Sequence, residues 1–255
     1  MNILVANDDG IRAEGIKRLV EALSGKANIY VFAPDSQRSA AGHGITVTRE
    51  ITCVPVAFPG ADKAFMVSGT PADCVKLGMR IMQSKGIDID MVFSGINHGS
   101  NVGTDTLYSG TVSAAIEGNL CGVPAAAVSV ASHQAEHFDM ACKLAVNALE
   151  KGFMRMDRMT TLNINTPNER QENIKGVKIT RLGIREYDNW LDEYPDENGT
   201  LSFRYSGEPV KHKSTNTEID VIALQEGYAT ITPLMFDLTN HHLFKIIKEW
   251  ELSEL

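Results

Sequence analysis

The chain has 255 residues, of which 43% are hydrophobic and 22% are charged, and its formal net charge is −8. This length is enough for one large α/β domain with a sizeable core, and the ordinary composition excludes a disordered chain. The negative charge argues against a general nucleic-acid binder, and no apolar run is long enough to cross a bilayer.

The first predicted element is a short buried strand over residues 3–6, followed closely by Asp8, Asp9 and Gly10. Open parallel sheets bind ligands at the carboxyl ends of their strands, and a glycine permits the turn that lets both carboxylates face one site. Two converging carboxylates repel unless a cation lies between them, and oxygen ligands suit Mg²⁺ or Mn²⁺. A metal site is therefore predicted here. The alternative is that the two acids only cap a helix from Ile11 onward.

Strands and helices then alternate along the chain. Apolar residues at helical spacing predict a first helix that Gly25 ends, and Pro55 and Pro59 mark the segment 45–65 as edge strands. Further buried strands are predicted at 29–33, 91–93, 124–130 and 161–167, and further helices from Pro71, from Gly110 and over about 135–149. The alternation predicts an α/β fold with a doubly wound, mostly parallel sheet between helices, a three-layer α/β/α arrangement.

Two later strand ends also carry oxygen-bearing side chains. The polar loop 36–44 contains Ser39, and the strand at 91–93 runs into a glycine-rich segment that contains Asn97. A third segment, Ser109-Gly110-Thr111, opens a helix of small residues, where free amides and the helix dipole favour a phosphate group. The alternative for this segment is an ordinary helix cap. Because adjacent strands bring such loops together, a metal and a phosphate ester are predicted at one site.

Beyond residue 176 the pattern changes. Strand-like runs at 177–181 and 201–205, with an acidic, turn-rich segment between them, predict a long hairpin arm. Two more strands are predicted at 217–223 and 227–233, followed by a final helix with Leu243, Ile246, Ile247 and Trp250. Such an arm cannot bury both of its faces alone, so a partner subunit is expected to cover part of it. The predicted division is a catalytic core over 1–175 and an oligomerisation segment over 176–255 that is not an independent domain.

The four cysteines predict reduced thiols. Cys53, Cys74, Cys121 and Cys142 stand far apart without a C-x-x-C pair, which argues against a disulfide or a zinc site. No basic segment followed by a long apolar run opens the chain, so a cytoplasmic protein is predicted.

Several motifs together resemble a known family, the SurE (survival protein E) 5′/3′-nucleotidases, over nearly the whole chain. The matching segments are Asn7-Asp8-Asp9-Gly10, Ala33-Pro34-Asp35 with Arg38-Ser39, Ser68 to Val75, Ser94-Gly95-Ile96-Asn97 with Gly99 and Asn101, Tyr108-Ser109-Gly110-Thr111-Val112, Asn163 with Asn165 and Pro167, and Ile231 to Leu234 with Asp237-Leu238-Thr239. The resemblance implies a Rossmann-like fold and metal-dependent hydrolysis of nucleoside 5′- and 3′-monophosphates. Short polyphosphate is a further candidate substrate. It also implies subunits that dimerise by exchanging carboxy-terminal elements and can pair into tetramers, with neither a membrane nor a stably bound nucleic acid as partner.

The resemblance also assigns roles to individual residues. It implies one divalent cation per subunit, Mg²⁺ or Mn²⁺, with four ligands: Asp8, Asp9, Ser39 and Asn97. It implies phosphate contacts at Ser109, Gly110 and Thr111, so these three, Asp8, Asp9 and Asn97 form the expected catalytic set. Two positions depart from the family pattern. Ala40 stands where a glycine is common, and Ser113 stands where a smaller residue is usual.

Two mechanisms are open for the nucleophile. In the favoured hypothesis the cation polarises a phosphoryl oxygen and acidifies the water that attacks phosphorus. In the rival hypothesis Asp8 attacks phosphorus directly, which we rank lower because enzymes of the phospho-aspartate type carry D-x-D rather than adjacent acids. The candidate general acids are His43, His98, His241 and His242, with His241 preferred. Trp190 and Tyr194 could stack on a base or cover a subunit interface.

The main alternative function is a dinucleotide-dependent oxidoreductase or a non-catalytic nucleotide-binding module on the same fold. Such a protein should carry G-x-G-x-x-G at its first strand-to-helix turn, where this chain carries two negative charges. A serine hydrolase is disfavoured because the chain has no G-x-S-x-G segment.

Overall fold

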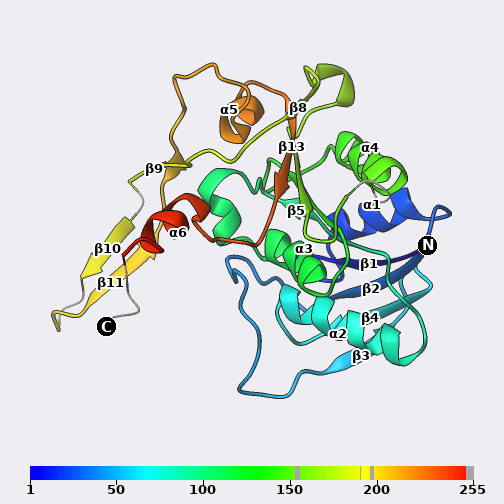
Figure 1. Ribbon diagram of the computed structural model, residues 1–255. Coiled ribbons are helices and arrows are strands. Elements are labelled where there is room, and N and C mark those ends of the chain that lie inside the picture. The colour runs from blue at the N-terminus through cyan, green and yellow to red at the C-terminus, as the bar shows by residue number, and fades with distance from the viewer. Residues whose placement is uncertain (153–155, 190, 196–197, 251–255) are drawn as a thin grey trace.

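The computed structural model of the protein describes residues 1–152, 156–189, 191–195 and 198–250. Nine strands form one sheet in the order β3-β4-β2-β1-β5-β6-β7-β13-β8 (Figure 1). These strands are β1 (Asn2–Ala6), β2 (Asn28–Pro34), β3 (Cys53–Val56), β4 (Lys63–Val67), β5 (Met91–His98), β6 (Ala125–Val130), β7 (Thr161–Thr166), β8 (Val177–Ile179) and β13 (Ala229–Leu234). The pairings are parallel except those of β3 with β4 and of β13 with β7. The predicted doubly wound, mostly parallel α/β fold is therefore confirmed.

Helices cover both faces of this sheet. The helices are α1 (Glu14–Leu23), α2 (Pro71–Ser84), α3 (Gly110–Leu120), α4 (Asp139–Asn147), α5 (Asp220–Gln225) and α6 (His241–Ile247), with short turns of other helix types at η1 (Gly103–Leu107), η2 (Ala148–Gly152) and η3 (Gln171–Asn173). Side chains alternate along a strand, so Ile3 and Val5 join one core with α1 and α4, while Leu4 joins the other core with α2 and α3. A strand that is apolar at every position is thus explained by burial on both faces.

Local sequence signals fix several helix ends. Thr70 and Asp73 form a reciprocal capping box at the start of α2, and Pro71 takes the first helical position, where its missing N–H costs nothing. The first helix begins at Glu14 rather than directly after the acidic pair, because residues 11–13 form a turn.

The structure corrects three predicted elements. The strand predicted at 91–93 continues to His98 as β5, past a register shift between Gly95 and Asn97. The helix predicted from about residue 135 begins at Asp139. The strand predicted at 217–223 is instead the helix α5, whose first residue, Asp220, is buried and accepts hydrogen bonds from the amides of Gly103 (2.7 Å), Gly183 and Val221 (both 2.8 Å).

The hairpin arm is shorter than predicted. The segment at 177–181 does not belong to it, because β8 joins the main sheet beside β13. The arm consists of β10 (Leu191–Pro195) paired with β11 (Leu201–Tyr205), and of β9 (Tyr187–Asp188) paired with β12 (Glu208–Pro209) at its root. Trp190 and the acidic residues 196–197 lie outside the described residues.

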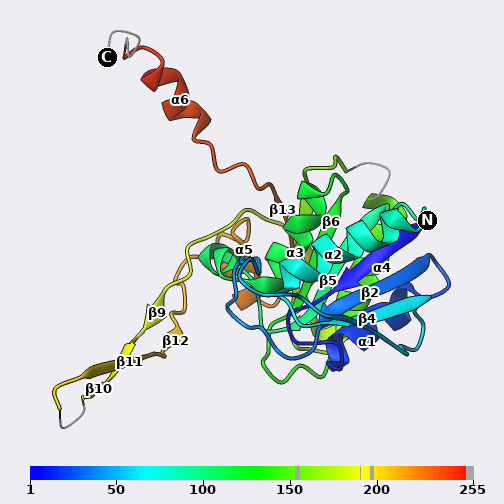
Figure 2. The same cartoon turned by 90° about the horizontal axis from the view of Figure 1, so that it is seen from below.

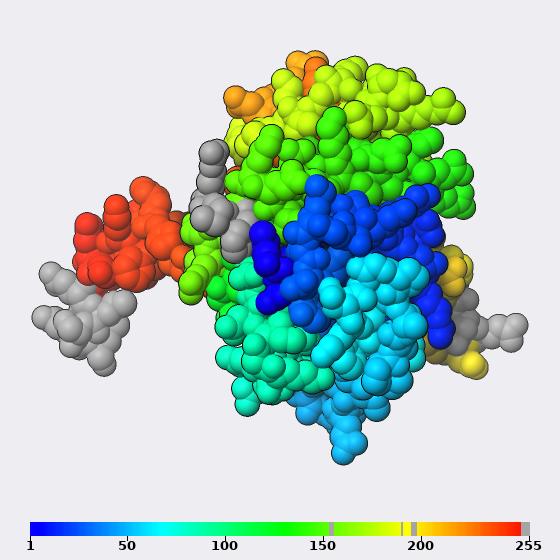
Figure 3. All heavy atoms as spheres, turned by 90° about the vertical axis from the view of Figure 1, so that its right-hand side faces the viewer, coloured from blue at the N-terminus to red at the C-terminus, as the bar shows by residue number. Residues whose placement is uncertain are grey.

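The hairpin and α6 both reach away from the body of the molecule. Figure 2 shows them leaving it in different directions, and Figure 3 shows α6 as a separate projection. Every residue of β11 is exposed, and so are four large apolar residues of the last segment: Leu243, Phe244, Ile246 and Trp250. No helix among the described residues is long and apolar enough to cross a membrane.

Candidate active site

Three strand ends meet at one edge of the sheet. Strand β1 lies between β2 and β5 and is parallel to both, so the segments that follow these three strands emerge side by side. A cavity of about 380 Å³ opens there, and Asp8, Ser39, Asn97 and Ser109 are among the residues that line it. The structure thus brings together one predicted residue from each strand end and the first residue of the predicted phosphate segment.

Asp8 is the most enclosed of the predicted ligands, with 5% of its surface exposed. The hydroxyl of Thr111 donates to its Oδ1 at 2.5 Å, and the amide of Arg38 donates to its backbone carbonyl at 2.8 Å. Burial raises the pKa of Asp8 to about 6, and the negative charge of Asp9 adds to this rise, against the hydrogen bond from Thr111. The carboxylate is therefore held in an environment that lacks a compensating positive charge.

Asp9 is half-buried beside it. Its Oδ2 accepts a hydrogen bond from the backbone amide of His98 at 3.0 Å, which joins the segment after β1 to the end of β5. The amide of Gln37 donates to the other oxygen at 3.4 Å. Asp9 is not among the residues that line the cavity.

Asn97 and Ser39 approach the cavity in different ways. The side-chain nitrogen of Asn97 donates to the carbonyl of Gly99 at 2.8 Å, so the amide oxygen is the atom left to serve as a ligand. Ser39 is exposed, and its hydroxyl oxygen accepts a hydrogen bond from Gln37 at 2.9 Å. Ala40, which follows, has a φ of 55°, a left-handed conformation that explains why glycine is favoured there.

The donors at this edge fit a hard divalent cation. All four predicted ligands offer oxygen, the donor that Mg²⁺ and Mn²⁺ prefer, and the raised pKa of Asp8 reflects mainly the burial of its charge, with a smaller part from Asp9, both of which a cation would offset. Across the described parts of the chain, no group of three or more His, Cys, Asp and Glu side chains is arranged to hold a metal. The predicted ligand set has two carboxylates, one amide and one hydroxyl. Only two of these four side chains are of the types His, Cys, Asp or Glu, so the set would not form a group of that kind.

The first turn of α3 closes the opposite side of the site. Ser109 is the N-cap, and its hydroxyl oxygen accepts from the amide of Val112 at 3.1 Å, so the simple capping role predicted as the alternative is real. Gly110 lies directly against Asp8, because a Cβ there would stand 2.9 Å from the Cβ of Asp8. The hydroxyl of Thr111 is committed to Asp8, so its proton is not free for a phosphate oxygen.

A buried amide network holds the glycine-rich segment in place. The amide of Asn101 donates to the side-chain oxygen of Asn165 at 2.7 Å, and its carbonyl accepts from the side chains of Asn163 and Asn165. The side chain of Asn101 donates to Ser129 at 2.9 Å. This network gives the asparagines of β7 a physical role that the sequence motif alone did not explain.

The histidines are distributed differently from the prediction. His98 lines the cavity, and so does His133, which the sequence analysis did not consider. His43 is bonded to Glu117, and the preferred candidate, His241, pairs with Asp237 at 3.0 Å on the projecting segment around α6. Within one chain His241 does not reach the site, as the position of α6 in Figure 2 shows.

The root of the arm supplies a wall of the cavity that sequence reasoning missed. Arg185 and Tyr187 both line it. The guanidinium of Arg185 donates to Ser100 at 2.9 Å and lies 3.3 Å from Asp105, whose carboxylate also accepts from the hydroxyl of Tyr187. The sequence analysis placed both residues in the predicted hairpin arm and assigned them no role in the site.

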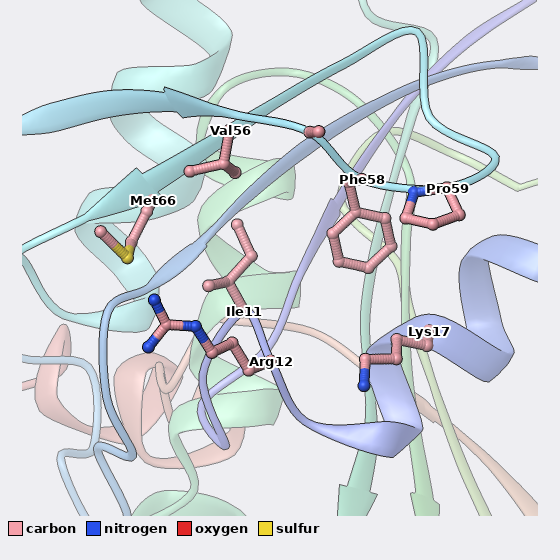
Figure 4. Close-up of a pocket in the computed structure, with 8 residues that line it drawn as sticks. Ile11, Arg12, Lys17, Val56, Phe58, Pro59 and Met66 are labelled. Atoms are coloured by element: carbon pink, nitrogen blue, oxygen red, sulfur yellow. The ribbon is translucent and has the colours of Figure 1, made fainter.

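A larger hollow elsewhere does not have the chemistry of an active site. It measures about 650 Å³, and its lining is mainly apolar, with Val56, Phe58 and Met66 among the residues in Figure 4. Arg12 and Lys17 are its only charged lining residues, and none of the predicted ligands lies in it. The smaller polar cavity is therefore the candidate site.

Comparison with known proteins finds relatives that match nearly the whole chain. Residues 3–189 match the family described as "Survival protein SurE". Proteins named 5′-nucleotidase SurE from Syntrophomonas wolfei and Pelotomaculum thermopropionicum are each 44% identical to this chain; the alignments cover 95% and 98% of it, and 92% and 95% of the relatives. The crystal structure of the SurE protein from Aquifex aeolicus matches with a TM-score of 0.83 at 36% identity, over 98% of this chain and all of that one. The matched region contains every predicted site residue.

Proposed function

The chain belongs to the survival protein SurE family, and from this premise we propose that it is a metal-dependent phosphomonoesterase that hydrolyses nucleoside monophosphates. The relatives are named for 5′-nucleotidase activity. We extend the proposal to 3′-monophosphates and to short polyphosphate, because an open cavity that binds mainly the phosphate group would accept several leaving groups. The proposed cation is Mg²⁺ or Mn²⁺.

One observation carries the proposal. The carboxylate of Asp8 is buried at the end of β1, carries a raised pKa, and packs directly against the first turn of α3. A cation at Asp8 and a phosphate at the helix end would therefore be neighbours. A metal site in contact with an anion site suits the metal-assisted hydrolysis of a phosphate ester.

The cation itself would be held by Asp8, Asp9, Ser39 and Asn97, and when bound it supplies positive charge that polarises a phosphoryl oxygen and acidifies water. The residues of this chain orient the reaction. Thr111 donates to one oxygen of Asp8, and the backbone amide of His98 donates to one oxygen of Asp9. The side-chain nitrogen of Asn97 donates to Gly99, so its oxygen is the atom available to the cation.

Phosphate binding is assigned to the first turn of α3. The hydroxyl of Ser109 accepts from Val112 and keeps its own proton for donation, and the amide of Gly110 lies at the same helix end. Donors of this kind contribute on the order of a few kcal/mol to a transition state. Thr111 donates its hydroxyl proton to Asp8, so it acts by holding that carboxylate and not by donating to the phosphate.

Release of inorganic phosphate tests the proposal. Purified protein with Mn²⁺ or Mg²⁺ should release phosphate from a panel of 5′- and 3′-nucleoside monophosphates, and excess chelator should abolish the release. Added metal should then restore it. Activity that persists in chelator, or reduction of a nicotinamide cofactor in place of hydrolysis, would contradict the proposal.

We also propose that the chain acts as a homodimer or homotetramer. The apolar residues exposed on α6 and on β11 support this, because isolated hairpins and short helices are marginal without a partner surface. Light scattering of the full chain measures the assembly directly.

A further inference from the structure

Glu117, in the middle of α3, is a buried acid that the proposed reaction does not use. It is 2% exposed, and both of its oxygens are occupied: Nε2 of His43 lies 2.9 Å from one and Nζ of Lys76 lies 2.8 Å from the other. Burial raises the pKa of Glu117, but the hydrogen bonds from His43 and Lys76 outweigh burial and hold it below its usual value. The carboxylate is therefore charged at neutral pH, and His43 must be the donor.

His43 lies in the loop that carries Ser39. The other bonds that fix this loop come mainly from its backbone: the amide of Arg38 donates to the carbonyl of Asp8, and the amide of Gly42 donates to the carbonyl of Tyr108 at 3.1 Å. Gln37 and Ala40 are exposed and Arg38 is half-buried, so no buried apolar side chain anchors the loop next to Ser39. The bond from His43 to Glu117 is thus a side-chain link between this loop and the interior.

The loop needs such a link because its conformation is strained. Ala40 holds a φ of 55°, a left-handed conformation that is unfavourable for a residue with a Cβ. A strained residue persists when surrounding contacts determine its conformation. The strain lies next to Ser39 and three residues before His43.

The same helix serves both sides of the site. Its first turn packs against Asp8 through Gly110 and Thr111, and Glu117 lies further along it. We propose that His43 is a positioning residue, which by donating to Glu117 holds Ser39 on the metal side of the site. The proposal rests on the proposed function only for the role of Ser39 as a metal ligand.

Three variants at residue 43 test it. His43→Ala removes the donor, His43→Gln keeps an N–H near the position of Nε2, and His43→Asn places its amide too close to the backbone to reach Glu117. Lys76→Met is the matched control, because it removes the other partner of Glu117 without touching the loop. There are two readouts. The first is Mn²⁺ binding without substrate, measured from the electron paramagnetic resonance signal of free Mn²⁺. The second is hydrogen exchange of the backbone amides of residues 38–46.

The expected result is that His43→Ala and His43→Asn weaken Mn²⁺ binding about tenfold, a typical effect of losing a residue that supports a metal ligand. Both should also speed exchange of the loop, whereas His43→Gln and Lys76→Met should remain within about threefold of the parent protein, as substitutions that leave the link intact. Unchanged exchange and Mn²⁺ binding in His43→Ala, or failure of His43→Gln to restore them, would overturn the proposal. If the parent protein bound no Mn²⁺, the proposed function would fail, and loop exchange would still decide the role of His43.

Discussion

The two sides of the candidate site are built on different principles. On the sheet side, Asp8 and Asn97 are buried at the ends of β1 and β5; Thr111 of α3 donates to Asp8, and Asn97 donates to Gly99, two residues further along its own segment. On the loop side, Ser39 is exposed and bonds only to Gln37 in its own loop, among the described contacts. The difference teaches that the sheet fixes the proposed ligands Asp8 and Asn97, while the loop brings the proposed ligand Ser39, whose exposed hydroxyl a water can replace.

The largest expected effect separates the two sides directly. Asp8→Asn should lower the rate of phosphate release by more than about 100-fold, beyond the usual cost of a residue that only supports a metal ligand. Ser39→Ala should lower it only about tenfold, because a water can take the place of an exposed hydroxyl. The measurement is kcat and KM at saturating Mn²⁺ for both variants.

Asp88→Asn is the control for the first substitution, because Asp88 is an exposed acid just before β5, at the opposite end of that strand. It should retain full activity. Equal losses in Asp8→Asn and Ser39→Ala would remove the distinction between a sheet side and a loop side.

A smaller effect is expected where the sheet side meets α3. In Gly110→Ala the new Cβ would stand 2.9 Å from the Cβ of Asp8 and 3.1 Å from Oδ2. The carboxylate must move by a few tenths of an ångström, and we expect a loss of about 10- to 100-fold in kcat, in line with the cost of small displacements of catalytic groups. Steady-state kinetics tests this. Leu120→Ala, at the exposed far end of the same helix, should leave kcat unchanged.

The smallest effect concerns stability rather than turnover. The pKa of Glu117 is lower in the folded protein than its ordinary value of 4.5, so its charge stabilises the fold above that value, and the contribution is lost as the pH falls through the folded pKa. Wild type should be more stable than Glu117→Gln by about 1–2 kcal/mol at pH 7, as expected for hydrogen bonds to a charged group. This difference in the free energy of unfolding between wild type and Glu117→Gln should disappear as the pH falls into the acid range.

Urea unfolding at a series of pH values measures this gap. Glu21→Gln on the surface of α1 is the control, since the side chain of Glu21 is 74% exposed and its contact with Arg18 is long, at 3.6 Å. A gap that stayed constant into the acid range would show that Glu117 contributes by shape and not by charge.

Much of the fold could be predicted because its signals are local. The apolar runs that became β1, β2 and β6 are buried on both faces, and the capping residues of α2 and α3 stand in the sequence beside the helices they open. The acidic pair after β1 could be located in the same way, since a strand that ends in two carboxylates is unusual within a core.

The errors arose where distant contacts decide the structure. The segment 217–223 alternates like a strand, but residues 220–225 are helical, and the carboxylate of Asp220 is held by the amides of Gly103 and Gly183 from distant segments. The segment at 177–179 has the pattern of a hairpin strand. It pairs instead with the distant strand β13, in which Ala229 lies opposite Val177. Arg185 lines the cavity because it contacts Ser100 and Asp105. These contacts are distant in sequence, so no local pattern around Arg185 could predict them.

Asp220 also connects the arm to the site mechanically. One oxygen of its carboxylate holds the amide of Gly103, at the end of the glycine-rich segment after β5, and the other holds the amide of Gly183, just before the hairpin begins. The base of the arm and the end of the segment that begins at Asn97 therefore share one buried anchor, the carboxylate of Asp220.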